Sequence, residues 1–186
     1  SADGVHAVCE NILDHSRKRD GERPLKLEEI SPKTFAEECV DAVRGMAEAK
    51  ALKVSARVDA EVPDALVTDK ARLRQILFNF LGNALKFTGS GGVELHVGLA
   101  ATPEAPTIRF AVEDTGPGIP EADLEKVFLP YAQLGTKAPG IKSGVGLGMA
   151  IAKDLAKELG AEIGVASAVG QGSTFWVGLP LRQAHS

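Results

Sequence analysis

The sequence predicts an α/β sandwich in which one mixed sheet carries its helices on a single face. Three observations favour this fold class. Segments with helical spacing of apolar residues lie on either side of a strand group, two alternating strands follow each other in mid-chain, and a β-hairpin ends the pattern. The 186 residues suffice for one globular domain with a short appendage.

Composition excludes several classes of protein. The chain is 44% apolar and carries 25 acidic against 21 strongly basic residues, a net charge of −4, which excludes wholesale disorder. No apolar stretch approaches the ~18 residues of a membrane-spanning helix. One tryptophan and one tyrosine on an acidic chain provide no basic, aromatic-rich face for nucleic acid. Two cysteines without metal-ligand spacing, and a start unlike a secretory signal, predict a reducing, cytoplasmic location.

Three helices and three short strands are expected in the first half of the chain. An apolar stripe predicts an amphipathic helix over 5–13. Ser31 and the proline after it can cap and begin a second helix, whose apolar residues span 35–46. Asp69 can cap a third, long helix that reaches Phe87. Short strands are expected at 26–30, 54–58 and 65–68.

The second half of the chain predicts a strand group around a long loop. Alternating apolar residues indicate adjacent central strands at 93–99 and 108–112. Residues 115–143 are rich in glycine and proline, with a helical turn or two near 121–128. A loop of this length in a compact domain is usually a lid or a binding segment. A helix at 147–159 and a hairpin made of 163–166 and 175–181 complete the pattern.

One face of the predicted 69–87 helix is unexpectedly polar. At about 100° per residue, two cations and two amides fall within an arc of about 60°. They are Arg72, Asn79, Asn83 and Lys86. Taken alone, such a stripe is most often a solvated face, because asparagine is a poor but not a rare helix residue.

Glycine marks the segment where a ligand is expected. Seven of the 20 glycines lie between Gly116 and Gly148, where the backbone must turn sharply or approach a ligand closely. Asp114 ends a strand just before them, which would place its carboxylate in a cavity with little side-chain bulk; an ordinary Asp-Gly turn is the alternative. The run from Gly144 to Gly148 opens a helix, where free backbone N–H groups favour phosphate.

Other phosphate-binding patterns do not fit this sequence. The P-loop pattern of glycines followed by lysine and a hydroxyl residue is absent. The cluster at Gly144 follows a long loop, whereas the dinucleotide fingerprint requires a buried strand directly before it. The His-Arg-Asp and Asp-Phe-Gly elements of protein kinases are absent too.

Five segments, taken together and in this order, resemble the sensor histidine kinases. They are the N box Leu73–Thr88 (LRQILFNFLGNALKFT), the G1 box Asp114–Gly118 (DTGPG), the F box Phe128–Tyr131 (FLPY), the G2 box Gly144–Gly148 (GVGLG) and the last glycine motif Gly170–Phe175 (GQGSTF). The resemblance covers residues 25–181. It implies the ATP-binding domain shared with gyrase, the Hsp90 chaperones and MutL. That domain is a Bergerat-type two-layer α/β sandwich, with a mixed, mostly antiparallel sheet and a mobile ATP lid, here at about 115–143.

The resemblance also implies roles for individual residues. Asn83 matches the asparagine that binds magnesium, and its neutral amide oxygen suits a hard cation that keeps its waters. Asp114 matches the carboxylate that reads adenine. Lys86 lies on the phosphate side of the helix, and Phe87 takes the position of an aromatic that packs on the base. The other implied nucleotide-binding residues are Gly116, Gly118, Ile119, Tyr131, Lys137, Lys142, Gly144, Val145, Gly146, Leu147, Gly148, Ser173 and Thr174, and either lid lysine could reach the γ-phosphate.

Asn79 distinguishes among the members of this superfamily. It lies one turn before Asn83, where ATP-hydrolysing members carry a glutamate that activates water. An amide cannot take up a proton at neutral pH. The resemblance therefore implies a site that binds Mg-ATP but hydrolyses it poorly, with Asn79, Asn83 and Lys86 as its catalytic positions and the γ-phosphoryl group kept for another nucleophile.

That nucleophile is expected outside this chain. The family's phosphoacceptor histidine lies on a helical hairpin and is usually followed by an acidic residue. None of the four histidines (His6, His15, His96 and His185) precedes an acid. Residues 1–22 are expected to be the end of the second hairpin helix, 23–183 the catalytic domain and 184–186 a tail. Cys9 and Cys39 lie on apolar faces and are expected to be buried structural thiols.

The leading hypothesis is thus a cytoplasmic protein-histidine kinase of two-component signalling that uses Mg²⁺ and ATP. Its expected partners are the hairpin, a receiver domain of a response regulator and a second copy of the full-length protein. No nucleic acid and no membrane contact by this fragment are expected, although a longer protein could be membrane-anchored. The alternative is a nucleotide-sensing interaction module that binds ATP without phosphotransfer, supported only by the irregular lid Gly135 to Ser143. Asn79 disfavours a conformational ATPase or a serine kinase.

Overall fold

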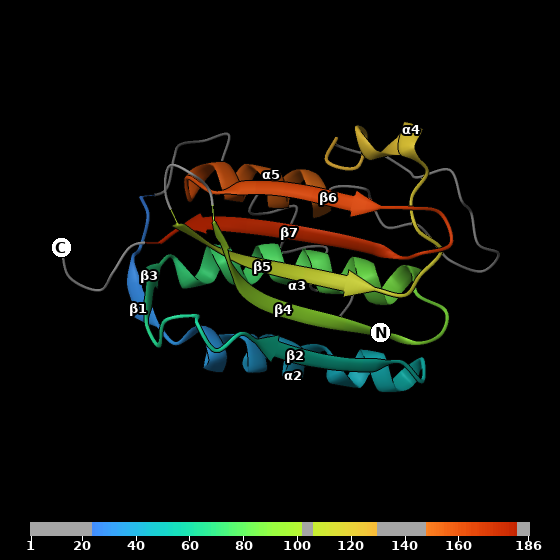
Figure 1. The fold of residues 1–186 in the computed structure, drawn as a ribbon, viewed down its shortest axis with the longest axis horizontal. Helices are drawn as coiled ribbons and strands as arrows, with labels where there is room; N and C mark the ends of the chain where they lie inside the picture. The colour runs from blue at the N-terminus through green and yellow to red at the C-terminus, as the bar shows by residue number, and fades with distance from the viewer. Residues whose placement is uncertain (1–23, 102–105, 130–147, 182–186) are drawn as a thin grey trace.

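The computed structural model of the protein describes residues 24–101, 106–129 and 148–181. Five strands in the described part form one sheet in the order β2-β4-β5-β7-β6 (Figure 1). β2 pairs with β4 in parallel, and the other three pairs are antiparallel. The strands are β2 (Lys53–Val58), β4 (Gly92–Ala101), β5 (Pro106–Asp114), β6 (Glu162–Ser167) and β7 (Ser173–Pro180).

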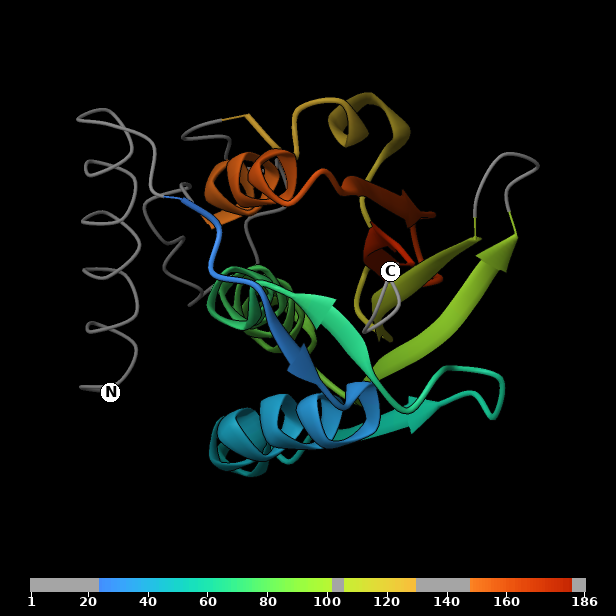
Figure 2. The same cartoon turned by 90° about the vertical axis from the view of Figure 1, so that its left-hand side faces the viewer.

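Helices cover one face of this sheet. Figure 2 shows α2 (Pro32–Ala49), α3 (Lys70–Phe87) and α5 (Gly148–Glu158) side by side on that face. The one-turn helix α4 (Glu121–Leu124) lies next to β6. A separate two-stranded ladder pairs β1 (Glu28–Ile30) with β3 (Leu66–Thr68). The predicted two-layer α/β sandwich, with a mixed and mostly antiparallel sheet, is therefore confirmed.

Side-chain caps fix where the two long helices begin. The Ser31 hydroxyl accepts a hydrogen bond from the Thr34 N–H at 3.2 Å, and a proline occupies the first turn of α2. The Asp69 carboxylate accepts from the Arg72 N–H at 3.1 Å at the start of α3. Both caps satisfy backbone donors that have no partner within the helix. The two predicted helix starts are confirmed.

The core lies between the sheet and the helices, and aromatic pairs bridge the two layers. Phe35 of α2 meets Phe110 of β5 edge to face, with ring centroids 6.0 Å apart. Phe80 of α3 lies 5.7 Å from Phe175 of β7. All four rings are buried. Because each pair joins a helix to a strand, packing of the side chains fixes the positions of α2 and α3 over the sheet.

Several predicted boundaries differ from the structure. The strand expected at 26–30 pairs only from Glu28, the second helix runs on to Ala49, and the last strand begins at Ser173. Cys39 is buried as expected, and burial raises the pKa of its thiol to about 12. Cys9 and the helix predicted over 5–13 lie outside the described residues. None of the helices in the described part of the chain combines the length and apolar character needed to cross a bilayer.

Candidate functional site

A small, partly open pocket lies where the C-terminal half of α3 meets the end of β5 and the start of β7. The lining is mostly apolar, with one carboxylate, one amide and one hydroxyl. The lining residues are Asn83, Ala84, Phe87, Asp114, Pro117, Gly118, Ile119, Pro120, Ser173 and Phe175.

The Asp114 carboxylate is held in place by backbone donors. Its Oδ1 accepts from the Gly116 N–H at 2.9 Å and from the Ser173 N–H at 3.2 Å. Burial raises the pKa of Asp114, and these two hydrogen bonds oppose that rise. No described residue donates a hydrogen bond to Oδ2. One oxygen is thus fixed while the other is available to a ligand.

Glycine 116 makes room beside this carboxylate. A Cβ at Gly116 would lie 3.0 Å from Asp114 Oδ1 and 3.3 Å from the Thr88 hydroxyl oxygen. Thr88 is completely buried, and its hydroxyl has no hydrogen-bond partner among the described residues. The same small space therefore holds a fixed carboxylate and an orphaned hydroxyl. Buried polar groups of this kind are uncommon away from ligand or water sites.

The β6–β7 turn packs against the loop that follows Asp114. Gly118 has φ +79°, and a Cβ there would collide with the Ala168 carbonyl in this turn. The Gly170 N–H donates to the Pro117 carbonyl at 2.8 Å. The loop after Asp114 and the β6–β7 turn therefore lie backbone to backbone, which only glycine permits at 118.

α3 supplies the opposite wall of the pocket. Asn83 and Phe87 line the cavity, and the Asn83 amide makes no hydrogen bond with any part of the protein that the structure describes. Lys86 is half-buried beside them, with its Nζ 5.3 Å from the centroid of the Phe87 ring. Burial lowers the pKa of Lys86. This face of the helix is therefore not simply solvated.

Asn79 has a different environment from Asn83. It is 9% exposed, and its Nδ2 donates to the Gly148 carbonyl at 2.9 Å. Gln75 Nε2 donates to the Asn79 oxygen at 3.3 Å. The Asn79 amide thus ties α3 to the first residue of α5, the end of the segment predicted to contact phosphate.

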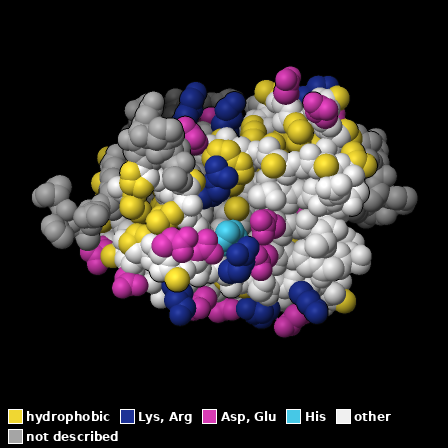
Figure 3. Space-filling model, in the orientation of Figure 1, with side chains coloured by type: hydrophobic (Ala, Val, Ile, Leu, Met, Phe, Trp, Pro, Cys, Tyr) yellow, Lys and Arg dark blue, Asp and Glu magenta, His cyan; other side chains and the backbone are white. Residues whose placement is uncertain are grey.

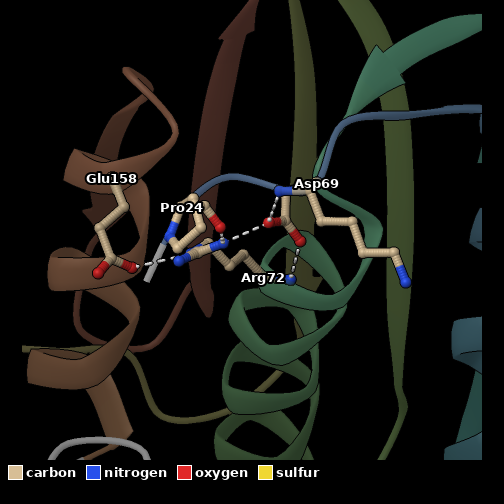
Figure 4. Close-up of polar contacts among 5 residues, drawn as sticks. Pro24, Asp69, Arg72 and Glu158 are labelled. Atoms are coloured by element: carbon tan, nitrogen blue, oxygen red, sulfur yellow. Dashed lines mark hydrogen bonds and ion pairs between the residues drawn. The ribbon is translucent and has the colours of Figure 1, made fainter. Parts of the chain in front are cut away.

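Arg72 belongs to a buried ion-pair cluster and lies apart from the pocket (Figure 4). Its guanidinium pairs with Asp69, and its Nε donates to Glu158 Oε2 at 3.1 Å. The Pro24 carbonyl accepts from the same guanidinium at 3.4 Å, and Asp69 Oδ2 accepts from the Lys26 N–H at 3.0 Å. Arg72 is one of the four polar residues on this arc of the helix. It therefore links α3 to α5 and to the chain before β1.

The remaining predicted site residues divide into three groups. Ile119 and Ser173 line the pocket, and Gly148 contacts Asn79. Thr174 is half-buried and is not among the lining residues. Outside the described residues lie Tyr131, Lys137, Lys142, Gly144, Val145, Gly146 and Leu147.

Sequence reasoning did not single out Ser167. Its hydroxyl accepts from the Ile119 N–H at 2.7 Å and lies 2.7 Å from the Ser173 hydroxyl. The predicted hairpin did indicate that these two serines are close, because a turn around 170–172 places Ser167 opposite Ser173. Pro117, Pro120 and Phe175 also line the pocket without having been named as ligand contacts.

The chemistry of the pocket favours a flat apolar ligand with an amine at its inner end. Apolar side chains and an aromatic ring surround the Asp114 carboxyl group, which is a poor partner for an anionic group. Asn83 lines the pocket from α3, and Lys86 lies on the same helix next to Phe87. Within the described ranges, no group of three or more His, Cys, Asp or Glu residues could hold a metal ion by itself.

Comparisons with known proteins agree with this arrangement. The sequence model of the family described as "Histidine kinase-, DNA gyrase B-, and HSP90-like ATPase" matches residues 68–183. Sensor histidine kinase AtsR of Burkholderia thailandensis is 33% identical over 184 residues, which cover 97% of this chain and 30% of AtsR. Sensor protein GacS of Pseudomonas syringae pv. syringae is 35% identical over 186 residues, which cover all of this chain and 20% of GacS.

Solved structures give the same result. The crystal structure of full-length ShkA in complex with AMPPNP superposes with a TM-score of 0.84 at 30% identity, over 99% of this chain and 37% of ShkA. The nucleotide-free catalytic domain of histidine kinase ThkA superposes with a TM-score of 0.66 at 23% identity, which supports the fold. The chain spans less than a third of the length of the two curated relatives. The matched family model and the fold together show that the chain belongs to the histidine kinase-, DNA gyrase B- and HSP90-like ATPase family.

Proposed function

We propose that this domain binds Mg-ATP and transfers its γ-phosphoryl group to a histidine on a helical hairpin, as part of two-component signalling in the cytoplasm. The observation that carries the proposal is the Asp114 carboxylate, whose Oδ1 is fixed by two backbone N–H groups while Oδ2 faces no protein donor in the described part of the chain. The AMPPNP complex of ShkA supports an adenine nucleotide as the ligand class.

Adenine suits the inner end of the pocket. Its exocyclic amine can donate to Asp114 Oδ2, whereas guanine carries a carbonyl at the same ring position. Two acceptors facing each other would leave a buried group unpaired, which costs on the order of 1–3 kcal/mol. The apolar walls and the Phe87 ring provide the surface on which a flat base packs. We therefore expect ATP to bind more tightly than GTP.

Magnesium fits the residues on the α3 side of the pocket, Asn83 and Lys86. Mg²⁺ binds few protein ligands, keeps several waters and bridges phosphate oxygens, so one neutral amide oxygen is enough from the protein. Asn83 offers such an oxygen, since its amide lines the pocket and is not engaged by any described residue. Bound there, the ion would neutralise phosphate charge. Lys86, half-buried one turn further along α3, adds a positive charge on the same side.

Asn79 favours phosphotransfer over hydrolysis. A general base for water would have to accept a proton, which an amide cannot do at neutral pH. The Asn79 amide is also committed to Gly148 and Gln75. With no such base at this position, the γ-phosphoryl group would be kept for a protein nucleophile.

The acceptor histidine is proposed to lie in another part of a longer protein. His96 of β4 alternates with the buried Leu95 and Val97, so it lies on the sheet face away from the helices. Figure 3 shows acidic and basic side chains gathered in the middle of the face in view. The Nε2 of His96 contacts Asp59 Oδ1 at 2.9 Å. This position is on the opposite side of the sheet from α3. A hairpin histidine, a receiver domain and a second copy of the full-length chain are the partners that we infer.

A titration and a phosphorylation assay test the proposal. Calorimetric titration of this domain with Mg-ATP, Mg-ADP and Mg-GTP should give the tightest binding for the adenine nucleotides. A longer protein that includes the hairpin should acquire an acid-labile phosphoryl group from labelled ATP. Bound ATP without any transfer would instead favour the nucleotide-sensing module, and no ATP binding at all would refute both functions.

A further inference from the structure

Ser167 lies at the junction of three segments that build the pocket. It is the last residue of β6, and its hydroxyl meets the Ile119 N–H at 2.7 Å, the Gly172 carbonyl at 2.9 Å and the Ser173 hydroxyl at 2.7 Å. Two of these partners, Ile119 and Ser173, line the pocket. Ser167 itself is not among the lining residues. It contacts the walls of the site without facing the ligand.

Proton counting assigns a direction to each of these contacts. A serine hydroxyl has one hydrogen to donate and two lone pairs. The Gly172 carbonyl can only accept, so Ser167 donates to it, and the Ile119 N–H can only donate, so Ser167 accepts from it. One lone pair of Ser167 then remains for the Ser173 hydroxyl, which must be the donor in that contact. All three contacts are satisfied only in this arrangement.

This arrangement determines what Ser173 presents to a ligand. Its single hydroxyl proton is directed to Ser167, so toward the pocket its oxygen can only accept. Its backbone N–H is also engaged, because it donates to Asp114 Oδ1 at 3.2 Å. The inner end of the pocket therefore offers two acceptors, Asp114 Oδ2 and the Ser173 oxygen, and no hydroxyl donor from Ser173.

The structure assigns Ser167 as a positioning residue for base discrimination, acting through the hydroxyl of Ser173. The assignment rests on the proposed binding of an adenine nucleotide in this pocket. With Ser167 in place, both acceptors suit the amine that adenine carries at the ring position where guanine has a carbonyl. Without it, the Ser173 hydroxyl can rotate and donate into the pocket, where it would pair with the carbonyl of guanine.

Ser167→Ala should therefore change selectivity as well as affinity. Binding of ATP should weaken because Ile119 and its loop lose a hydrogen bond. Binding of GTP should weaken less, because the released Ser173 hydroxyl can donate to the guanine carbonyl. The ratio of the GTP and ATP dissociation constants should fall roughly fivefold, the change expected from one neutral hydrogen bond. A purely structural role would weaken both nucleotides equally and leave the ratio unchanged.

A double-mutant cycle tests the route of the effect. The dissociation constants of Mg-ATP and Mg-GTP are measured by calorimetry for the unaltered domain, S167A, S173A and the double variant. S167A should lower the ratio only when Ser173 is present. Ser167→Thr keeps a hydroxyl at a strand position and should restore the ratio. Ser55→Ala, at an exposed position of β2, is the matched control and should change nothing.

The outcomes separate this inference from the proposed function. If the unaltered domain binds no adenine nucleotide, the proposed function fails first. If it binds ATP selectively and folded S167A has the same ratio, only the role of Ser167 is refuted. The role of Ser167 would also be refuted if S167A lowered the ratio of the GTP and ATP dissociation constants equally in the presence and absence of Ser173. If S167A does not fold, Ser167→Cys gives the same comparison, because a cysteine sulfur is only a weak acceptor. An unchanged ratio of dissociation constants in S167C would again overturn the assignment.

Discussion

A carboxylate that reads a base must be ionised, oriented and partly desolvated at the same time. Asp114 meets these requirements with two backbone hydrogen bonds on one oxygen and with burial around the other. Its position at the end of β5 depends on Gly116 and on Ser173, residues that belong to two different segments of the chain. The orientation of this one side chain is therefore a property of the fold.

Asp114→Asn is expected to weaken ATP binding by roughly tenfold to a hundredfold. The substitution keeps the size of the side chain but removes the negative charge that strengthens the hydrogen bond to the adenine amine. Calorimetric titration measures the loss. Unchanged affinity in a folded variant would show that the base is bound elsewhere.

Acidification should have a similar effect on the unaltered protein. Burial raises the pKa of Asp114 above its ordinary value of 3.8. Because a carboxyl group is ionised only above its pKa, the acceptor is lost as the pH falls through this raised value. ATP affinity should therefore fall on acidification more steeply than it does in D114N, which also controls for protonation of the phosphates. Parallel pH profiles of the two proteins would contradict this prediction.

Asn83→Ala should remove most of the magnesium dependence of ATP binding. In our proposal the Asn83 amide is the protein's ligand to the ion, and alanine has no donor atom to replace it. The measurement is the ratio of ATP dissociation constants with magnesium and with excess chelator, compared between the variant and the unaltered domain. A variant that still responds fully to the metal would show that another residue binds it.

At the scale of an element, the start of α3 is stabilised by charge in a nearly dry environment. Arg72 is 7% exposed and Asp69 is 2% exposed. Burial alone would raise the pKa of Asp69, but hydrogen bonds from the Lys26 and Arg72 backbones and the Arg72 guanidinium outweigh it and lower the pKa. The ionised pair therefore contributes stability above the ordinary carboxyl pKa, and this contribution is lost as the pH falls through the lowered value.

Arg72→Met should destabilise the domain by about 3–5 kcal/mol, because the nearly buried Asp69 carboxylate would lose the guanidinium that pairs with it. The measurement is the free energy of unfolding in denaturant. Arg74→Met is the matched control on the same helix: Arg74 is 44% exposed, and its contact with Glu38 is 4.0 Å long. That substitution should cost less than about 1 kcal/mol. A similar loss of unfolding free energy in both variants would show that the buried cluster contributes no more stability than the exposed ion pair.

Local signals in the sequence predicted most elements but not how distant segments meet. Ser31 and Asp69 marked both helix starts because a cap acts on residues three positions away. Asn83, Phe87 and Asp114 were placed together by a resemblance, and the pocket contains all three. The role of Arg72 depended on Glu158, 86 residues further along the chain, and no local pattern predicts such a pair. The contact between Ser167 and Ile119 is likewise a consequence of tertiary structure.

At the scale of the whole molecule, the pocket lies between the helical layer and the sheet. One wall comes from α3 and the other from β5, β7 and the loop after Asp114. Two polar links also join α3 to α5, Asn79 to Gly148 at one end and Arg72 to Glu158 at the other. A ligand held between Asn83 and Asp114 would connect both layers, so its binding should stabilise the fold as a unit.

Mg-ATP should therefore raise the melting temperature of the domain, by an amount that grows with the logarithm of its affinity. A ligand at 100 times its dissociation constant adds about 2.7 kcal/mol to the folded state. For a chain of 186 residues this corresponds to an increase of about 5–10 °C. Mg-GTP at the same concentration should give a clearly smaller shift, because its carbonyl faces the Asp114 carboxylate. In D114N the shift with ATP should approach that with GTP. Equal shifts for both nucleotides in the unaltered domain would mean that the stabilisation comes from the phosphates alone and that the carboxylate does not read the base.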